Sequence, residues 1–501
     1  MKRLLPGLTA FTAAMLVALL GLYAEAGTPE PRKGKAPPPP VVKLRLLGVN
    51  DFHGHLEPPR PGIGGAAWLK SHLDRATLPG HTIRVHAGDM VGATPLISSL
   101  FHDEPAIEAA NEIGFDVGTV GNHEFDEGGD ELMRLLQGGQ RTGPEALKPD
   151  VTGRLVNTSS PDFGGTDFPY IAANTVDRDG ELLLPPYEIV ERAGARVGFI
   201  GVTTRSTPTF LLERHAARFR FTDISEAVDR WVPELRRRGV EAIVVLAHAG
   251  GPGQDQSDAP DFVGEIVDEA RQMSSAVDVV VAGHSHSRIQ VRLPNSDGSG
   301  DKLIVEALSY GVAYDLVDIR VDTRTGEVVS KTGEIPDTRH EGVEGDAGVA
   351  ALVERYRERV APLADHVVGV ADAPLTRSGG ELGQLVANAE RAYAGTDVAV
   401  VKPVSLRADI EAGPVTYAEV AEALAFDHPV LRLTMSGRRL RELIGADAYV
   451  AGPEQLNSDA SYSVAASELI AGGGRAVGTE PQALAWFLAP GGRLRSDPDR
   501  L

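Results

Sequence analysis

The stretch ⁴⁸GVNDFHGHL⁵⁶ places Asp51 and His53 two residues apart, directly after residues that are typical of a strand. The preceding run, ⁴²VKLRLLGVN⁵⁰, is rich in Val and Leu and predicts a buried strand. Polar side chains at the end of a buried strand are costly unless a partner satisfies them. The stretch therefore indicates that these side chains coordinate a ligand where the first strand ends.

The same pattern recurs along the chain. Further strands are predicted at residues 83–87, 115–121, 197–204, 243–248, 277–283, 303–308 and 314–322, with helices such as 105–114 and 225–239 between them. This alternation predicts an α/β fold with buried strands. The polar groups that follow strands are Asp89 in ⁸⁸GDMVGATP⁹⁵, Asn122 and His123 in ¹²¹GNHEFDEG¹²⁸, His248, and His284 and His286 in ²⁸³GHSH²⁸⁶. Ligands of α/β sheets bind outside the carboxyl ends of the strands, so we expect five strand ends to form one site.

Each cluster alone also has an ordinary structural explanation. A single His-x-His can be a loop, and Gly-Asp after a strand is often a turn. Nine other histidines, His86 and His102 among them, have no such context and are interpreted as surface or core residues. Five clusters in order at the ends of successive strands are not expected by chance, so we interpret the set as one site.

Composition limits the chemistry. The chain has 501 residues, which predicts two or more domains, and its apolar content of 42% is ordinary for a globular protein. The net charge of −21 argues against nucleic-acid polymers as partners. Because the chain contains no cysteine, thiol nucleophiles and thiolate metal sites are excluded. Any metal ion must be held by nitrogen and oxygen.

The first 26 residues have the pattern of a signal peptide. Lys2 and Arg3 precede the apolar run 8–23, and ²⁴AEA²⁶ predicts cleavage after Ala26. We therefore expect a periplasmic or extracellular protein without stable membrane insertion after cleavage. The alternative is a retained anchor helix, although the apolar run is short for a membrane span.

The rest of the chain divides into two predicted domains. Residues 27–40 form a Pro-rich linker, and residues 41–335 form the larger domain. Residues 336–363 are expected to be a linker and connecting helix, with the helix at 347–363. Residues 364–501 form a smaller α/β domain with strands at 397–402 and 430–437, and the tail 491–501 is expected to be frayed.

The motifs resemble those of a known family. The order Asp-x-His, Gly-Asp, Gly-Asn-His-Glu, His, Gly-His-x-His resembles that of the calcineurin-like binuclear metallophosphoesterases. NDFHGHL, GNHEFD and a separate C-terminal domain resemble the 5′-nucleotidase and UDP-sugar hydrolase family, most specifically over residues 41–320. The resemblance implies an N-terminal four-layer α/β/β/α catalytic sandwich and a C-terminal α/β domain that determines substrate specificity.

The resemblance also implies a binuclear metal centre. One ion would be held by Asp51, His53 and His286, the second by Asn122, His248 and His284, with Asp89 bridging both. A carboxylate can span ions about 3.5–4 Å apart. Imidazole and carboxylate ligands favour Zn²⁺, Mn²⁺ or Fe over Ca²⁺ or Mg²⁺. Two carboxylates leave the centre about two charges positive, so it can attract a phosphoryl group inside an acidic protein.

The reaction implied is hydrolysis of a phosphate ester by a metal-bound or bridging hydroxide. Asn122 would be both ligand and phosphate orienter, and His123 would act at the transition state. Asp126 is placed to hydrogen-bond the ring of His123 and to favour its charged form. Asp126 could instead be an N-cap for a helix starting near Gly129.

In the C-terminal domain, Arg407 matches an arginine of the family's substrate loop and Phe426 matches the first base-stacking aromatic. Arg377 matches a further substrate arginine, offset by about one residue. Lys402 stands where the family usually has Asn, and Glu468 stands where the second aromatic is expected. Losing that aromatic removes stacking worth about 1–3 kcal/mol, which puts base-specific recognition in question. The nearby aromatics interpreted as core residues instead are Tyr462, Trp486 and Phe487.

The sequence therefore predicts a secreted, metal-dependent phosphohydrolase that acts on nucleoside 5′-phosphates or related small esters. The alternatives are a cyclic-nucleotide or nucleotide-sugar phosphodiesterase, a broad phosphomonoesterase, and a non-catalytic extracellular binding protein. Nothing in the sequence specifies an oligomeric state.

Overall fold

The computed structural model describes residues 41–149, 154–251, 256–257 and 263–489. The predicted signal peptide, the Pro-rich linker and the tail 491–501 lie outside these residues. From Val41 onward the chain forms one compact unit. Within the described part of the chain, no helix combines the length and apolarity needed to cross a membrane.

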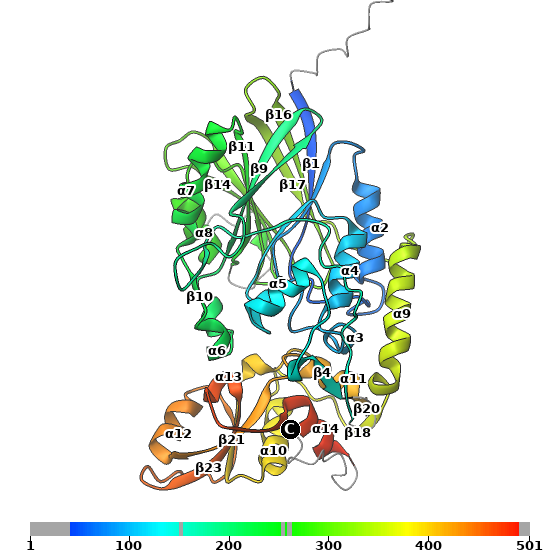
Figure 1. Ribbon diagram of the computed structural model, residues 1–501, viewed down its shortest axis with the longest axis vertical. Helices are drawn as coiled ribbons and strands as arrows, with labels where there is room; N and C mark the ends of the chain where they lie inside the picture. The colour runs from blue at the N-terminus through cyan, green and yellow to red at the C-terminus, as the bar shows by residue number, and fades with distance from the viewer. Residues whose placement is uncertain (1–40, 150–153, 252–255, 258–262, 490–501) are drawn as a thin grey trace, which may run out of the picture. The chain divides into compact units, whose positions relative to one another are not determined.

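The larger part of this unit contains two sheets that face each other (Figure 1). The six-stranded sheet has the order β17 (Val328–Glu334), β16 (Asp315–Asp322), β1 (Val41–Val49), β2 (Thr82–His86), β3 (Val117–Thr119), β6 (Tyr170–Ile171). The seven-stranded sheet has the order β12 (Gln256–Ser257), β14 (Arg288–Pro294), β15 (Asp301–Ala307), β13 (Val279–Ala282), β11 (Ala242–His248), β9 (Ala195–Thr203), β8 (Tyr187–Arg192). β1, β2 and β3 pair in parallel, as do β9, β11 and β13. Their carboxyl ends therefore meet at the same edge of each sheet.

Alternation along the strands builds three apolar layers. Leu44 and Leu46 of β1 and Val244 and Leu246 of β11 belong to one apolar core between the sheets. The opposite face of β1 packs beneath α2 (Ala66–Ala76) and α4 (Glu104–Ile113). The outer face of the other sheet packs beneath α7 (Ile224–Arg237) and α8 (Glu265–Gln272). The predicted four-layer α/β/β/α sandwich is confirmed (Figure 1).

The predicted connecting helix is α9 (Ala347–Ala364). It begins at Asp346, whose carboxylate accepts the backbone N–H of Val349. Its apolar side packs into the same core as α2 and α4, and its Tyr356 hydroxyl donates to Glu108 at 3.0 Å. The segment is thus an integral element of the larger part, as well as the covalent connection between the two parts.

The smaller part is a second α/β assembly. Its five-stranded sheet has the order β22 (Tyr449–Ala451), β19 (Val398–Val401), β23 (Ser461–Ser467), β21 (Pro429–Ser436), β24 (Arg475–Thr479), and β18 (Val367–Ala371) pairs with β20 (Gly413–Thr416). Its helices are α10 (Glu381–Ala394), α11 (Tyr417–Ala423), α12 (Gly437–Ile444), α13 (Glu468–Ala471) and α14 (Glu480–Leu488). Short elements complete the chain: α3 (Leu96–Ser99), α5 (Gly129–Gln137), α6 (Glu213–Ala216), β4 (Leu147–Pro149), β5 (Leu155–Asn157), β7 (Thr175–Asp177), β10 (Phe219–Phe221), η1 (His123–Phe125), η2 (Pro144–Ala146), η3 (Thr207–Thr209) and η4 (Pro403–Ser405).

Two carboxyl groups are buried in the core of the smaller part. Glu390 of α10 is 0% exposed and Glu480 of α14 is 1% exposed. Among the described residues, neither oxygen of Glu390 has a hydrogen-bond partner, and Glu480 Oε2 has none. Burial raises the pKa of both carboxyls, that of Glu480 to about 8, because the charged form loses its hydration.

We expect stability to fall as the pH rises from 4.5, the ordinary glutamate pKa, towards about 8. In this range the folded chain keeps protons that the unfolded chain has released, so the slope of unfolding free energy against pH is negative. One such group contributes up to about 1.4 kcal/mol per pH unit. Glu480→Gln should flatten the slope measured by urea unfolding, whereas Glu454→Gln, at an exposed position, should not. Equal slopes in wild type and Glu480→Gln would contradict this account.

Candidate metal centre

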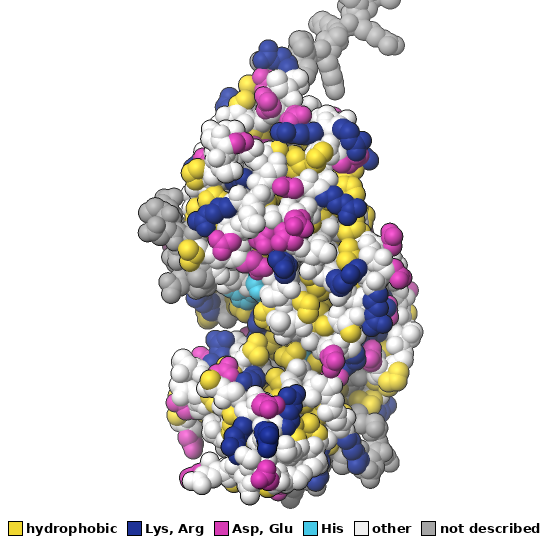
Figure 2. Space-filling model, turned by 90° about the vertical axis from the view of Figure 1, so that its left-hand side faces the viewer, with side chains coloured by type: hydrophobic (Ala, Val, Ile, Leu, Met, Phe, Trp, Pro, Cys, Tyr) yellow, Lys and Arg dark blue, Asp and Glu magenta, His cyan; other side chains and the backbone are white. Residues whose placement is uncertain are grey.

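The site lies across the carboxyl ends of both sheets. Asp51 and His53 follow β1, Asp89 follows β2, and Asn122 follows β3 in the six-stranded sheet. The seven-stranded sheet contributes His248 at the end of β11 and His284 and His286 after β13. Parallel pairing thus brings all seven predicted ligands from distant parts of the chain to one region. On the face shown in Figure 2, a histidine side chain surfaces in the hollow between the larger and smaller parts.

Metal-competent atoms converge in overlapping groups of three. In each group, one ligand atom of each residue lies within 4.8 Å of the others. The groups are Asp51, His53 and His286; His53, Asp89 and His123; and Asp89, His248 and His284. Asn122 joins the third group, because its Oδ1 lies 3.1 Å from His248 Nε2. Asp89 belongs to two of the three groups, and its Oδ2 lies 3.0 Å from His248 Nε2 and 3.7 Å from His53 Nε2.

The backbone at the site is held in an uncommon conformation. Five of the seven predicted ligands have positive φ angles: Asp51 (49°), His53 (47°), Asp89 (52°), His284 (77°) and His286 (54°). Non-glycine residues rarely occupy this left-handed region, where each costs about 1–3 kcal/mol. The surrounding fold therefore stabilises an arrangement that aims these side chains inward.

Close approach of two loops also requires a glycine. A Cβ at Gly121 would lie 2.2 Å from Asp89 Oδ1 and 2.7 Å from the His248 ring. Since real Cβ contacts are never so short, any side chain at this position would displace Asp89 or His248. The Gly of the Gly-Asn-His-Glu motif therefore permits the packing of the cluster.

Hydrogen bonds orient the histidine rings. His53 Nδ1–H donates to the carbonyl of Gly92, and His248 Nδ1–H donates to the carbonyl of Ala87, each at 2.8 Å. These bonds leave the Nε2 lone pair of each ring for the centre of the cluster, the arrangement usual for imidazole bound to a metal.

Two buried polar atoms lack protein partners among the described residues, and one is suited to contact a cation and the other a phosphate oxygen. Asp51 Oδ2 accepts from Asn50 Nδ2 at 2.7 Å and from the His284 N–H at 2.8 Å. Within the described residues, Asp51 Oδ1 and Asn122 Nδ2 are buried without a hydrogen-bond partner. An unpartnered carboxylate oxygen 3.3 Å from His286 Nε2 is suited to a divalent cation, and an amide N–H is suited to an anionic oxygen.

The histidines of the centre differ in their electrostatics. Burial lowers the pKa of His248, but the carboxylates of Asp89 and Asp51 outweigh burial and raise it to about 10. Burial lowers the pKa of His284 to about 4. The donor set of imidazoles, one amide and two carboxylates fits divalent transition-metal ions.

The sequence analysis missed two supporting residues. Asn50 donates to Asp51, and its Oδ1 accepts the N–H of Ala307 at 2.9 Å. Glu124 is buried and accepts three backbone N–H groups, from Gly121 at 2.6 Å and from Asp89 and Met90 at 2.9 Å. Both adjoin predicted ligands in the motifs, and that adjacency was the only available signal.

His123 and Asp126 form a hydrogen-bonded pair. His123 Nδ1 lies 2.8 Å from Asp126 Oδ2. Burial lowers the pKa of His123, but Asp126 and Asp89 outweigh burial and raise it. The alternative role for Asp126 is not observed, because α5 begins after Gly128 without a side-chain cap.

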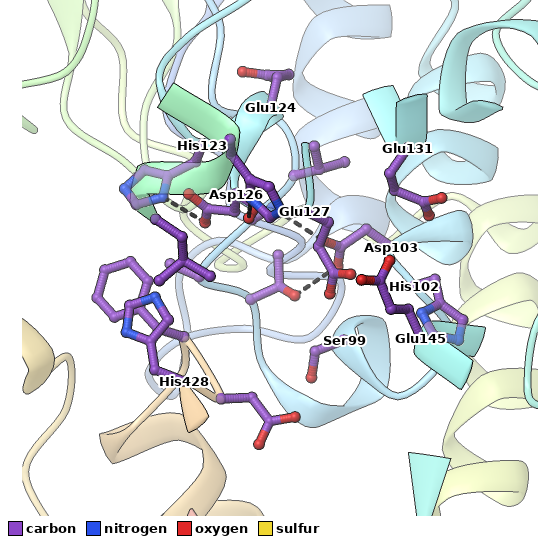
Figure 3. A pocket seen from close by; sticks show the side chains of 18 of the residues that line it. Ser99, His102, Asp103, His123, Glu124, Asp126, Glu127, Glu131, Glu145 and His428 are labelled. Carbon is purple, nitrogen blue, oxygen red and sulfur yellow. Dashed lines mark hydrogen bonds and ion pairs between the residues drawn. The ribbon is translucent and has the colours of Figure 1, made fainter. Parts of the chain in front are cut away.

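A cavity of about 180 Å³ adjoins this pair. Figure 3 shows His123 and His428 on one side of it and His102, Glu131 and Glu145 on the other. His102 is a structural residue, since its Nε2–H donates to the carbonyl of Ala146 and its Nδ1 accepts from a buried arginine. The sequence analysis did not identify His428 as part of the site.

Ion pairs join the two parts around the cavity. Lys148 Nζ lies 3.2 Å from Asp427 Oδ2, and Arg214 pairs with Glu468. Glu468, which replaces the aromatic residue expected from the family pattern, therefore makes an ionic contact with the larger part. Lys402, which replaces the Asn expected from the family pattern, makes its contact within the smaller part. Its Nζ lies 2.7 Å from Asp447 Oδ1.

The predicted substrate residues of the smaller part differ in position. Arg407 faces the centre: its guanidinium lies 5.5 Å from the ring of Phe426, and its Nη2 is buried with no partner among the described residues. Phe426 stacks on His123 at 5.5 Å. Arg377 is not brought to the centre; its side chain is 47% exposed and pairs with Asp409 at 3.0 Å.

Comparisons with known proteins agree with this geometry. The profile of calcineurin-like phosphoesterases matches residues 44–288, and that of the 5′-nucleotidase C-terminal domain matches residues 365–452. The chain is 34% identical over 464 residues to Endonuclease YhcR of Bacillus subtilis (strain 168), covering 88% of this chain and 36% of YhcR. It is 31% identical over 413 residues to Cell wall protein Lmo0130 of Listeria monocytogenes serovar 1/2a (strain ATCC BAA-679 / EGD-e), covering 74% of this chain and 51% of Lmo0130.

The chain thus spans about a third to a half of the length of these two relatives. In fold it is similar to the crystal structure of a 5′-nucleotidase precursor from Thermus thermophilus, with a TM-score of 0.69 and 22% identity over 89% of this chain and 96% of that one. The two family matches and the shared fold show that the chain belongs to the calcineurin-like phosphoesterase family and carries a 5′-nucleotidase C-terminal domain.

Proposed function

We propose that the protein is a secreted phosphohydrolase that uses two divalent metal ions to release phosphate from nucleoside 5′-phosphates or related small phosphate esters. The observation that carries this proposal is the convergence of two metal-competent groups. One is Asp51, His53 and His286 with the unpartnered Asp51 Oδ1, and the other is Asp89, His248 and His284. The name of the relative Lmo0130, a cell wall protein, supports an extracellular location, as does the signal-peptide pattern.

Seven residues would hold the ions. Asp51, His53 and His286 form one set, Asn122, His248 and His284 form the other, and Asp89 is shared. When bound, two such ions, for which Zn²⁺, Mn²⁺ or Fe are the best candidates, activate water and offset charge on phosphoryl oxygens.

The remaining groups bind and orient the phosphoryl group. Asn122 Nδ2 and Arg407 Nη2 are buried donors without protein partners in the described chain, and both suit phosphoryl oxygens. Asp126 accepts a hydrogen bond from His123 Nδ1–H, which leaves Nε2 to face the substrate. From Nε2, a charged His123 can donate a hydrogen bond to the phosphoryl group or a proton to the leaving oxygen.

Phosphate release from a panel of esters tests the proposal. The panel contains nucleoside mono- and diphosphates, cyclic nucleotides, nucleotide sugars and an aryl phosphate, each with Zn²⁺, Mn²⁺ or Fe²⁺. We expect metal-dependent phosphate release from nucleoside 5′-monophosphates and the aryl ester. Release from none of the esters with any metal would overturn the proposal.

A phosphodiesterase is the second candidate. The ionic role of Glu468 and the name of the relative Endonuclease YhcR favour it, although the matched region is 36% of that protein. Including DNA, RNA and cyclic nucleotides in the panel separates the two, provided that the products are identified by chromatography, because cleavage of a diester gives a monoester and an alcohol and no free phosphate. A diesterase would cleave these substrates faster than monoesters. A non-catalytic binding protein has less support, because every predicted ligand is present.

Arg407→Ala should lower kcat/KM by about 10- to 100-fold, because hydrogen bonds to a charged group contribute about 1.5–3 kcal/mol. Arg324→Ala is the matched control, and we expect it to cost less than about 5-fold, since its side chain is 75% exposed and solvent screens its ion pair with Asp322. Steady-state kinetics with one monoester measures both. Equal losses in the two variants would show that Arg407 has no special contact with substrate.

A further inference from the structure

The ring of Phe426 is surrounded by groups of the protein. Its centroid lies 5.5 Å from that of His123 with an interplanar angle of 29°, and 5.0 Å from that of His428 at 6°. The guanidinium carbon of Arg407 lies 5.5 Å from the same centroid. Stacking and cation contacts of this kind are those that a bound base would otherwise make with the ring.

No second aromatic faces Phe426 from the described residues of the smaller part other than His428. Glu468, at the predicted place of that aromatic, pairs with Arg214. Tyr462 accepts the N–H of Asn457 at 2.9 Å, and Trp486 packs on Tyr393. None of these three predicted positions therefore supplies a second ring opposite Phe426.

The ring of His123 has contacts in two directions. Its Nδ1 bonds Asp126 within the ring plane at 2.8 Å. That bond fixes the direction of Nδ1–H, but combined changes of the two side-chain torsions still allow some rotation of the ring plane. Phe426 lies against the face of the ring, and His53 meets it edge-on at 5.0 Å and 72°. Contact with the face restricts the rotation that the hydrogen bond leaves open.

We propose that Phe426 is a positioning residue for His123, and that the site selects substrates by their phosphoryl group without stacking a base. This inference rests on the proposed phosphohydrolase function. It also means that the smaller part completes the active site by orienting a residue of the larger part. Misplacing a reacting group by about 1 Å can cost about 100-fold in rate, so even a modest rotation of His123 should be measurable.

The test compares AMP with ribose 5-phosphate, two monoesters that differ only in the base. Phe426→Leu should lower kcat about 10-fold or more for both, by the same factor and with the ratio of their KM values unchanged. Phe426→Tyr, which keeps the ring, should restore most of the rate. A rise in KM for AMP alone, with kcat for ribose 5-phosphate unchanged, would overturn the proposal and assign Phe426 to base stacking.

A second measurement does not depend on activity. Modification of His123 by diethyl pyrocarbonate, followed by mass spectrometry, should be several-fold faster in Phe426→Leu than in wild type or Phe426→Tyr, because His123 is only 6% exposed beneath that ring. The exposed His366 should react equally in all three proteins. An unchanged rate of modification at His123 in Phe426→Leu would show that Phe426 does not cover the His123 ring, which would overturn the proposal. If wild type hydrolyses neither ester but His123 reacts faster in Phe426→Leu, the proposed function fails and the contact stands.

Discussion

Replacing Asp89 with Asn should reduce kcat/KM by more than about 100-fold and lower the metal content. Asp89 is the only proposed ligand shared by both sets, and its Oδ1 also accepts the N–H of His123 at 2.9 Å. Removing an outer hydrogen-bond partner of a metal ligand costs about 10- to 100-fold in affinity or activity. Loss of the shared charge affects both ions directly, so its effect should exceed that range. Phosphate release and elemental analysis of the same sample measure it.

The matched control is Asp459→Asn, which makes the same chemical change at a side chain that is 88% exposed. We expect wild-type rate and metal content in this variant. Because Asn has nearly the shape of Asp, the fold of Asp89→Asn should persist, which circular dichroism checks. Full activity and full metal content in Asp89→Asn would mean that the cluster does not hold the ions through this carboxylate.

His123→Ala should lower kcat by about 10²- to 10⁴-fold while leaving both ions in place, the usual range for loss of a general acid or base. His123 falls within one of the metal-competent groups, so geometry alone permits it to be a ligand. Its bond to Asp126 and its stacking on Phe426 favour the role towards substrate. If it protonates the leaving oxygen, the loss should be smaller for aryl esters, whose leaving groups need less protonation, than for alkyl esters.

The control for this variant is His366→Ala, at an exposed position. Metal content distinguishes the two roles of His123. Loss of an ion from His123→Ala, with the rate restored by excess metal, would assign His123 to the metal centre. An equal loss of rate for aryl and alkyl esters would argue against proton donation.

The positions of the strands along the chain and the convergence of the seven ligands were accessible from the sequence because they follow from local rules. Parallel strands rich in Val, Ile and Leu place their carboxyl ends together, and the polar residues after β1, β2, β3, β11 and β13 then meet across the carboxyl ends of the two sheets. The predicted bounds of these strands agree with the structure to within a few residues. The β3 strand is shorter than predicted, Val117–Thr119, because the chain already turns towards Asn122.

Other features depend on long-range packing and leave no local signal. The positive φ angles of Asp51 and Asp89 arise from the surrounding loops, and no periodicity encodes them. The contact of Phe426 with His123 joins residues that are far apart in the chain, through the docking of two α/β parts. Arg377 and Arg407 were both predicted to contact the substrate, and only the tertiary structure shows that Arg377 pairs with Asp409 while Arg407 faces the centre.

Elemental analysis of the purified protein, combined with anomalous diffraction from its crystals, tests the central claim most directly. The account predicts two divalent ions per chain, one on each side of Asp89, among the side chains of Asp51, His53 and His286 and those of Asn122, His248 and His284. A metal-loaded protein with a single ion, or with ions bound away from these residues, would contradict it.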